Sequence, residues 1–456
     1  MSVSRSGLLA NDGLTLAAAY RMGATDPVAV LEKTLESARQ AEHVFIFLDP
    51  KRARREAEAS WARWKAGQPL SVLDGVPIAW KDLFDVSGSV TTTGAAFRRG
   101  SPVATTDAYL VRQLARAGLV SVGKTNLSEL AYSGLGLNPN FGTPANAASA
   151  QERRIPGGSS SGSGVAVGAG IVPIAMGTDT AGSIRIPAAL NGVVGYRSTT
   201  ARYPMDGVFP LARTLDALGP ITRSVRDVLM LDALIKRATS NAPEALPVRG
   251  LRLRVDPDVL IDSRVEPAVR ENLEQALKQL CNAGALVDYR PVQALQQTLK
   301  VIETEGWLGS AEAFTLHEAL LGSPEADQLD PRVRTRLEAA RHFPASRQIK
   351  LYQARERLQR EMTLELDGAV LVTPTVAHVA PLLEPLERDD ALFIATNLAT
   401  LRLTMPGSLL DMPGVSLRSG CDGDGLPTGL LLSVPSGEDT YLLRVALGVE
   451  AVLLQR

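Results

Sequence analysis

The 456-residue sequence predicts an α/β protein, because short apolar runs alternate with amphipathic helical segments from about residue 70 onward. The clearest alternation joins the strand-like run VPIAW (76–80), the helical segment DAYLVRQLARAG and the strand-like run LVSV (119–122). The chain is 45% hydrophobic and 21% charged, which is the composition of a globular protein with a large buried core.

The segment before about residue 70 is expected to be helical, unlike the alternating strands and helices that follow it. Residues 14–40 and 51–66 repeat apolar side chains at helical spacing and predict an outer helical layer over 14–66. No internal repeat or Pro-rich linker divides the chain, and 238–250 is expected to be a surface loop. The other expected elements are a helix beginning near Asn126, strands at 171–177, 251–255 and 369–375, helices over 266–283 and up to about 365, and a final helix over 438–454.

Charge and cysteine content exclude several classes of partner. Lys and Arg (48) nearly balance Asp and Glu (49), and no long run of like charges occurs, so neither nucleic acid nor an anionic membrane is expected as a partner. The two cysteines, Cys281 and Cys421, form neither a disulfide framework nor a metal-binding spacing. The longest apolar stretch, 165–176, is too short to span a bilayer. We therefore expect a cytoplasmic protein that acts on a small molecule.

The segment GLVSVGKT (118–125) matches the phosphate-binding loop pattern G-x-x-x-x-G-K-T. In such a loop the strand precedes the first glycine, and the residues after it offer backbone N–H groups to phosphate. Here 119–122 is itself the predicted strand and a helix precedes Gly118. This context argues against nucleotide binding.

The segment PGGSSSGSGVAVG (156–168) contains G-x-S-x-G centred on Ser160, the pattern of a serine nucleophile on a sharp turn, and its composition also fits a flexible linker. A nucleophile turn needs an apolar strand before it and a histidine after it, whereas the preceding segment is polar and contains proline. His317 and His342 lie on charged helical segments expected to face solvent, and His378 is expected in a loop. A Ser/His/Asp triad is therefore disfavoured.

A lysine can replace histidine as the base when burial lowers its pKa from about 10.4. Lys81 ends the apolar run 76–80, so it either points inward as such a base or reaches solvent at the strand end. In GTDTAGSIRIPA (177–188), small residues surround Ser183 after a predicted strand. Such a turn can direct consecutive N–H groups at one oxygen, although an ordinary glycine turn with a serine helix cap has the same pattern.

Several long motifs, taken together, resemble those of the amidase signature hydrolases, which use a Ser/cis-Ser/Lys triad. They are GVPIAWKDLFDVSGSVTTTG, VGKTNLSELAYSG, PGGSSSGSGVAVGAG and GTDTAGSIRIPAALNGVVGYRST, and they occur in the family's order. The resemblance is dense over about 70–230 and looser over the more variable part 240–456. It implies one amidase domain over 1–456, built on a large mixed β-sheet covered by helices on both faces.

The resemblance also implies roles for individual residues. Ser183 matches the nucleophile, Ser159 matches the bridging serine that follows a cis peptide bond, and Lys81 matches the catalytic lysine. The mechanism requires neither a metal nor a cofactor. Ala181 stands where relatives carry glycine, which is tolerable only if its φ is negative. The N–H groups implied to form the oxyanion hole are those of Thr180, Ala181, Gly182 and Ser183.

The segment GLGLN (134–138) replaces a more polar stretch of the family, so Gly134, Leu135 and Gly136 are expected to form an apolar wall of the substrate site. Together with Trp80 this predicts an apolar or aromatic substrate, unless Trp80 and Leu137 only fill the core. Arg185 is a candidate for binding a substrate carboxylate, and a salt bridge to the scaffold is the favoured alternative.

The implied function is a serine hydrolase that cleaves the C–N bond of small-molecule amides through an acyl-enzyme, similar in type to small bacterial indoleacetamide and aryl-amide hydrolases. Carbamates (urethanes) and esters are further candidate substrates, and a homodimer is compatible with this interpretation. The alternative function is the amidase-like subunit of a glutamine-dependent tRNA amidotransferase. A binding protein without catalysis is disfavoured because Lys81, Ser159 and Ser183 are all present.

Overall fold

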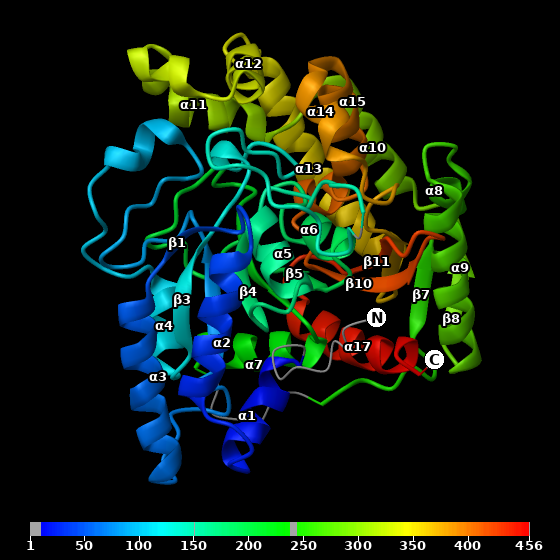
Figure 1. The fold of residues 1–456 in the computed structure, drawn as a ribbon. Coiled ribbons are helices and arrows are strands. Elements are labelled where there is room, and N and C mark those ends of the chain that lie inside the picture. Colours follow the sequence, from blue (N-terminus) through cyan, green and yellow to red (C-terminus); the bar gives the residue numbers. More distant parts are fainter. Residues whose placement is uncertain (1–10, 150, 238–243, 456) are drawn as a thin grey trace.

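The computed structural model describes residues 11–149, 151–237 and 244–455, and within them eleven strands form one sheet (Figure 1). The spatial order is β1-β3-β2-β4-β6-β5-β10-β11-β9-β7-β8. The strands are β1 (Phe45–Leu48), β2 (Pro77–Lys81), β3 (Val120–Thr125), β4 (Ile174–Asp179), β5 (Val194–Arg197), β6 (Ala217–Thr222), β7 (Arg252–Val255), β8 (Leu286–Tyr289), β9 (Val370–Pro374), β10 (Gly414–Cys421) and β11 (Pro427–Ser433).

The sheet is mixed, as the family resemblance implied. Strand β2 runs parallel to β3 and β4, and β7 runs parallel to β8 and β9. The remaining neighbours are antiparallel, including the β10–β11 hairpin that joins β5 to β9. Parallel neighbours place the carboxyl ends of β2 and β4 at the same edge, so the residues that follow these two strands lie close together.

Apart from the helix expected near Asn126, the predicted helical segments are present with small shifts. The helices are α1 (Gly13–Arg21), α2 (Pro27–Gln40), α3 (Pro50–Lys65), α4 (Tyr109–Arg116), α5 (Ser161–Gly168), α6 (Arg185–Leu190), α7 (Val225–Ile235), α8 (Pro257–Ile261), α9 (Pro267–Asn282), α10 (Gln293–Glu305), α11 (Gly309–Leu321), α12 (Pro331–Ala339), α13 (Ala345–Leu366), α14 (Leu383–Arg388), α15 (Asp390–Leu401), α16 (Met405–Leu409) and α17 (Asp439–Leu453). The short 3₁₀ turns are η2 (Ala96–Gly100), η3 (Glu129–Ala131) and η4 (Pro324–Gln328).

Asp-Pro steps explain where several helices begin. The side chain of Asp26 accepts hydrogen bonds from two N–H groups at the start of α2, and that of Asp49 accepts one from the N–H of Arg52 in α3. Asp330 caps α12. In each case proline occupies the first turn, where its missing N–H costs nothing.

Alternate side chains of β2 enter two different apolar cores. Ile78 and Trp80 belong to the larger core, which includes residues of α1, α4, α7 and α17. Ala79 belongs to a second core built with α2, α3 and α5. Because successive strand residues point to opposite faces, helices cover both faces of the sheet, as expected.

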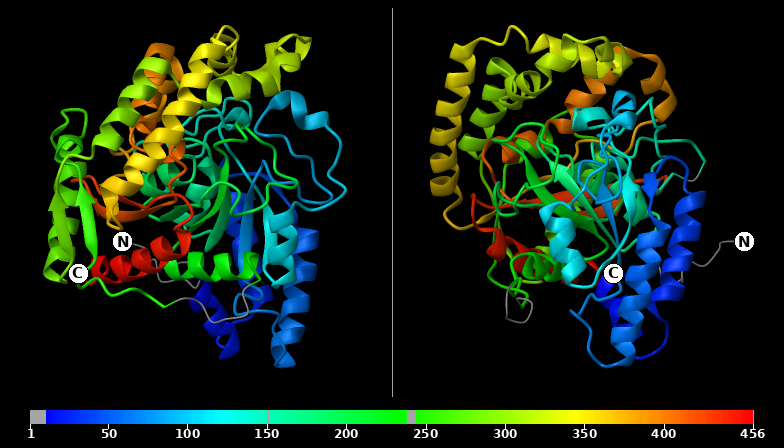
Figure 2. Two further views of the ribbon diagram at one scale, coloured as in Figure 1. Left: turned by 180° about the vertical axis from the view of Figure 1, so that it is seen from behind. Right: turned by 90° about the vertical axis from the view of Figure 1, so that its left-hand side faces the viewer.

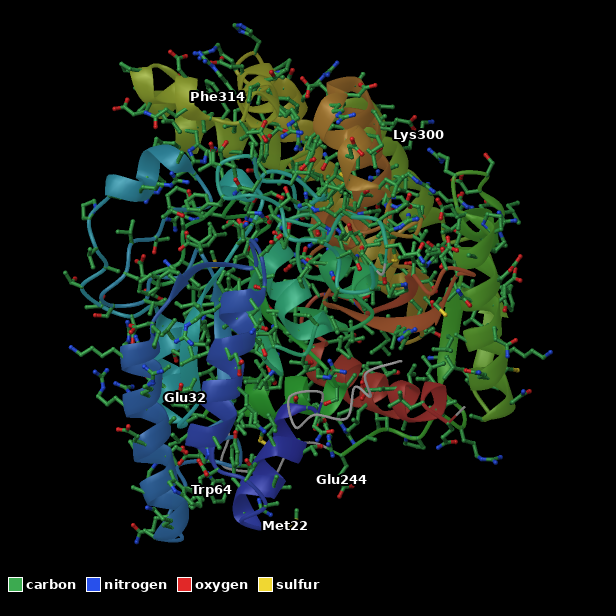
Figure 3. The ribbon with its side chains drawn as sticks, in the orientation of Figure 1. Met22, Glu32, Trp64, Glu244, Lys300 and Phe314 are labelled. Atoms are coloured by element: carbon green, nitrogen blue, oxygen red, sulfur yellow. The ribbon has the colours of Figure 1, made fainter. Side chains whose placement is uncertain are left out.

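Helices α10 to α15 gather at one end of the molecule and form what we call the cap, whereas α1 to α3 extend toward the opposite end (Figures 1 and 2). Figure 3 shows Lys300 of α10 and Phe314 of α11 in this cap. The guanidinium of Arg341 lies 5.1 Å from the centroid of the Phe314 ring. Within the described residues, none of the helices combines the length and the apolar character that crossing a membrane requires.

The helix expected near Asn126 is absent, and that prediction was wrong. The side-chain amide of Asn126 donates to the carbonyl oxygens of His43 and Gly142, each at 2.8 Å, so it fastens an extended segment. Leu130 and Ala131 then adopt left-handed conformations, with φ of 51° and 59°. Tertiary hydrogen bonds outweigh the local helical propensity here.

The expectation that His317 faces solvent was also wrong. His317 lies in α11 with 4% of its surface exposed, and its ring stacks on Phe209 with 5.9 Å between the centroids. Burial lowers its pKa to about 4, so it is neutral at physiological pH. His342 is exposed, as expected.

Candidate active site

Lys81, the last residue of β2, is fully buried and does not reach solvent. Its Nζ donates hydrogen bonds to Ser159 Oγ at 2.7 Å and to Thr178 Oγ1 at 2.8 Å. Burial lowers the pKa of Lys81 to about 7, although the negative charges of Asp179 and Asp216 oppose this shift. The lysine is therefore neutral in a large fraction of molecules near pH 7.

Ser159 lies in the loop that precedes α5, and the peptide bond between Gly158 and Ser159 is cis, as the family resemblance implied. This loop packs closely against the segment 134–136. The N–H of Gly158 donates to the carbonyl of Gly134 at 2.7 Å, and a Cβ on Gly158 would approach the nitrogen of Gly136 to 2.5 Å. The glycines of this motif therefore allow two loops to touch, which a flexible linker would not require.

Ser183 lies in the turn that follows β4 and is 5% exposed. The N–H of Ser160 donates to the carbonyl of Ser183 at 3.2 Å, so the loop carrying Ser159 is fixed to this turn. The hydroxyl of Ser160, the centre of G-x-S-x-G, points to the carbonyl of Thr178 at 3.4 Å. Ser159, and not Ser160, is thus the serine that contacts the buried lysine.

The turn 180–183 contains Ser183 and the N–H groups implied to form the oxyanion hole. Within the described chain, none of the N–H groups of 180–183 donates to a backbone carbonyl. Gly182 has a φ of 142°, and a Cβ there would collide with Thr404 Oγ1. Ala181 is not among the residues with positive φ, and its carbonyl accepts a 2.6 Å hydrogen bond from Thr404 Oγ1. Ala181 therefore meets the requirement of a negative φ that its side chain imposes.

Asp179, the last residue of β4, precedes this turn, and its carboxylate holds the residues on the other side of the turn. Burial disfavours its charge, but the ion pair and hydrogen bonds with Arg185, together with the charge of Arg197, lower its pKa to about 2. The guanidinium of Arg185 lies 2.9 Å from the carboxylate, and that of Arg197 lies 3.7 Å away. The carboxylate also accepts from the N–H of Ile184 at 3.2 Å. It therefore anchors the residue that follows the nucleophile.

Of the two roles that the sequence allowed for Arg185, substrate binding and a salt bridge within the protein, the structure shows the salt bridge. It is fully buried, and its guanidinium donates to Asp179, to the carbonyl of Thr404 and to Ser408 Oγ at 2.7 Å. It does not line the cavity beside Ser183. Arg197 is likewise buried and donates to the carbonyl of Met412 at 3.0 Å.

A cavity of about 250 Å³ opens beside Ser183. It lies between the turn 180–183, the segment 131–133 and helices of the cap. Its lining consists of Ala131, Tyr132, Ser133, Thr180, Ala181, Ser183, Leu211, Trp307, Ser310, Arg336, Ala339, Leu398, Leu401 and Met405. A larger cavity of about 580 Å³ near Arg98 and Arg213 includes none of the three candidate triad residues.

The wall predicted at 134–136 lies outside this lining, which uses the three preceding residues instead. The N–H of Gly134 donates to Asn397 Oδ1 at 2.8 Å, whereas Leu135 and Leu137 fill an apolar core under the cap. Gly136 packs against the loop that carries Ser159. Trp80 is buried in the main core, 5.6 Å from the ring of Phe84. These residues support the site rather than contact its cavity.

Sequence reasoning missed several residues of the site. Thr178 and Asp179 lie within the quoted motif at 177–188, so their position beside Ser183 was a usable signal. Thr404 and the cap residues Trp307 and Arg336 carried no such signal, because they follow the nucleophile by more than 100 residues in segments without a motif.

The G-x-x-x-x-G-K-T segment forms β3 and part of the turn before it. The Nζ of Lys124 lies 2.5 Å from Asp82 Oδ1 and donates to the carbonyl of Val90 at 2.9 Å. Both charged side chains are fully buried. The lysine of the pattern is therefore part of a structural ion pair, which agrees with the rejection of a phosphate-binding loop.

Known proteins are similar in sequence to this chain over most of its length. A family model described as Amidase matches residues 28–443. A 2-amino-5-chloromuconic acid deaminase of Comamonas testosteroni is 33% identical, covering 89% of this chain and 88% of its own. A mandelamide hydrolase of Pseudomonas putida is 32% identical, with 90% and 85% covered. A glutamyl-tRNA(Gln) amidotransferase subunit of Symbiobacterium thermophilum is 32% identical, with 95% of both chains covered.

The fold is shared as well. A solved crystal structure of an amidase superposes with a TM-score of 0.85 at 33% identity, covering 97% of this chain and 99% of that one. In this structure Lys81 donates to Ser159, the N–H of Ser160 donates to the carbonyl of Ser183, and of these residues Ser183 lines the cavity. The chain therefore belongs to the amidase family and is an amide-hydrolysing enzyme.

Proposed function

We propose that the protein hydrolyses small amides through an acyl-enzyme on Ser183, with Ser159 as proton relay and Lys81 as base. One observation carries this proposal. Lys81 is fully buried, its pKa is lowered to about 7 by burial, and its Nζ lies 2.7 Å from Ser159 Oγ. A neutral amine in this position can accept a proton at physiological pH.

In the first half of the reaction, neutral Lys81 accepts the proton of Ser159, and Ser159 accepts that of Ser183. Ser183 Oγ forms a bond to the carbonyl carbon, and the electron pair of the C=O bond moves to oxygen. The N–H groups of 180–183 stabilise this oxyanion, because none of them is bonded to a backbone acceptor within the described chain. The fixed backbone of the turn means that little reorganisation is needed when the charge develops.

In the second half, the oxyanion collapses and the C–N bond breaks. Ser159 gives its proton to the leaving nitrogen and regains one from Lys81, so an amine departs and an ester remains on Ser183. Water then attacks the ester carbon while the same relay removes its proton. Breakage of the C–O bond releases the carboxylic acid and returns Ser183 to its hydroxyl form.

The cavity favours small substrates that have an apolar or aromatic part. Its volume of about 250 Å³ is small for a ligand site, and Trp307, Leu401 and Met405 are among its lining residues. The mandelamide hydrolase relative supports an aromatic amide as a substrate class. Carbamates and esters are proposed as secondary substrates, because the activated serine attacks their carbonyl carbons in the same way.

A substrate panel with mass spectrometry tests this function. The purified chain is assayed with aryl amides, carbamates and esters, and we expect amide turnover together with a mass increase on Ser183 when the reaction is quenched early. Ser183→Ala and Ser159→Ala should lose this activity. Ser160→Ala is the matched control, because its hydroxyl makes only a 3.4 Å contact to a backbone carbonyl. A fully active Ser159→Ala variant would contradict the relay.

The role of an amidotransferase subunit is the weaker alternative. It is supported by the 32% identity to the glutamyl-tRNA(Gln) amidotransferase chain, but no acidic side chain among the described lining residues could pair with the α-ammonium group of glutamine. Turnover that appears only after partner subunits and glutamine are added would favour this alternative. The homodimer and the cytoplasmic location stay predictions, and light scattering of the purified protein tests the first of them.

A further inference from the structure

The cavity beside Ser183 contains one unexpected charge. Among the described residues that line it, Arg336 of α12 is the only charged one, and no acidic side chain shares the lining. The other lining residues are apolar, aromatic, or carry a hydroxyl group. A cation in an otherwise uncharged cavity is costly unless something negative compensates it.

Within the described residues, the guanidinium of Arg336 interacts with Tyr132. One N–H of its guanidinium donates to the carbonyl of Tyr132, and the guanidinium carbon lies 4.4 Å from the centroid of the Tyr132 ring. Stacking on the ring and one hydrogen bond fix the plane of the group. An arginine has five N–H donors, so most of them are left for another acceptor.

The other arginines of α12 are paired differently. Arg332 forms an ion pair with Asp330 at 2.9 Å, and Arg334 forms one with Asp327 at 2.7 Å. Arg336 has no carboxylate partner in the part of the chain that the structure describes. The helix thus satisfies two of its arginines within the protein and directs the third to the cavity of the nucleophile.

We propose that Arg336 is a specificity-determining residue that binds a carboxylate of the substrate, so that the preferred substrates are small amides bearing one carboxylate group. This inference rests on the proposed function, since it concerns the same cavity and the same nucleophile. A guanidinium fork matches a carboxylate with two parallel hydrogen bonds, and the apolar surroundings strengthen that interaction. The size of the cavity limits the spacer between amide and carboxylate to a few carbon atoms or one ring.

The competing interpretation is that Arg336 only fastens α12 to Tyr132. The two interpretations differ in one measurable quantity, the preference between a charged substrate and a neutral one of the same shape. A fastening role affects both substrates alike, whereas carboxylate binding affects only the charged one.

The experiment therefore uses matched pairs. Glutaramate is compared with glutaramide, and 4-(carbamoylmethyl)benzoate with 4-(carbamoylmethyl)benzamide, by following ammonia release for wild type, Arg336→Met and Arg334→Gln. We expect wild type to prefer the carboxylate member of at least one pair, and Arg336→Met to reduce that preference by about 10-fold or more. Arg336→Lys should restore part of it. Arg334→Gln, on the same helix with an exposed ion pair, should leave it unchanged.

Two outcomes would overturn the inference: a wild-type enzyme that hydrolyses both members of each pair equally, or an Arg336→Met variant that loses both activities in the same proportion. If wild type hydrolyses no amide at all, the proposed function fails instead. Arg336 is then still tested by calorimetric titration of glutarate into the full-length wild type and Arg336→Met. Equal binding to the two would reject carboxylate recognition, and weaker binding to the variant would support it.

Discussion

Two buried lysines lie on neighbouring strands of the sheet, and their partners differ. Lys81 ends β2 and Lys124 lies near the end of the parallel strand β3, where Lys124 pairs in register with Trp80. Both have no exposed surface. Lys124 forms a 2.5 Å ion pair with Asp82, whereas the hydrogen bonds of Lys81 Nζ within the described residues go to the hydroxyls of Ser159 and Thr178.

The contrast shows that the partner, and not burial, decides what a buried lysine does. Burial lowers the pKa of both lysines, but for Lys124 the charge of Asp82 opposes the shift directly. Lys81 has only the more distant charges of Asp179 and Asp216, and its pKa falls to about 7. One lysine is therefore a candidate base, and the other is half of a structural ion pair.

The largest expected effect is the loss of activity in Lys81→Met. Removing the base should reduce kcat by about 10²- to 10⁴-fold, the usual contribution of general-base catalysis. Steady-state kinetics with the best amide of the panel measures the loss, and Lys124→Met serves as the comparison. A Lys81→Met enzyme with more than a tenth of wild-type activity would mean that the two lysines do not differ as described.

For the stability of the fold we expect the reverse order, with a larger loss in Lys124→Met than in Lys81→Met. Lys124→Met leaves the buried carboxylate of Asp82 without its partner, which should lower the free energy of unfolding by about 3–5 kcal/mol. Lys81→Met removes a buried amine that forms no ion pair with a carboxylate among the described residues, so the loss of stability should be much smaller. Urea denaturation monitored by circular dichroism measures both. The double variant Asp82→Asn/Lys124→Met should recover part of the loss, and a double variant as unstable as the single one would argue against the ion pair.

A pH profile is the third test. The protonated form of Lys81 cannot accept a proton, so kcat/KM should rise with pH and level off above about 7, following the lowered pKa. Below that value the rate should fall about tenfold per pH unit. The ionisation of Lys124 should leave no trace in this profile. A flat profile between pH 5 and pH 8 would remove Lys81 from the mechanism.

The smallest expected effect concerns Thr178, which accepts a 2.8 Å hydrogen bond from Lys81 Nζ. Thr178→Val removes an acceptor that favours the charged amine, so the midpoint of the pH profile should move to lower pH. The loss of one positioning hydrogen bond should reduce kcat/KM by about 5-fold at neutral pH. Thr178→Ser retains the hydroxyl and should behave like wild type, whereas an equal loss in both variants would indicate a packing effect.

The fold was predictable where local pattern and tertiary environment agree. The final helix expected over 438–454 is α17, and the amphipathic segment 266–283 is α9. The prediction was wrong at Asn126, because its side chain donates hydrogen bonds to carbonyl groups that are distant in the sequence. It also missed β1, a strand of four residues that lies between the helices predicted over 14–66. Short segments carry too little periodicity to reveal partners that are remote in the chain.

The sequence by itself determined the family, the mixed sheet and the order of the motifs that carry Lys81, Ser159 and Ser183, because each motif encodes its own strand end or turn. Tertiary structure alone decided which residues surround the nucleophile. Arg336 and Trp307 line the cavity, whereas the segment 134–136 lies outside its lining. A cavity is enclosed by segments far apart in the chain, so its lining depends on how helices pack on the sheet, which no local pattern specifies.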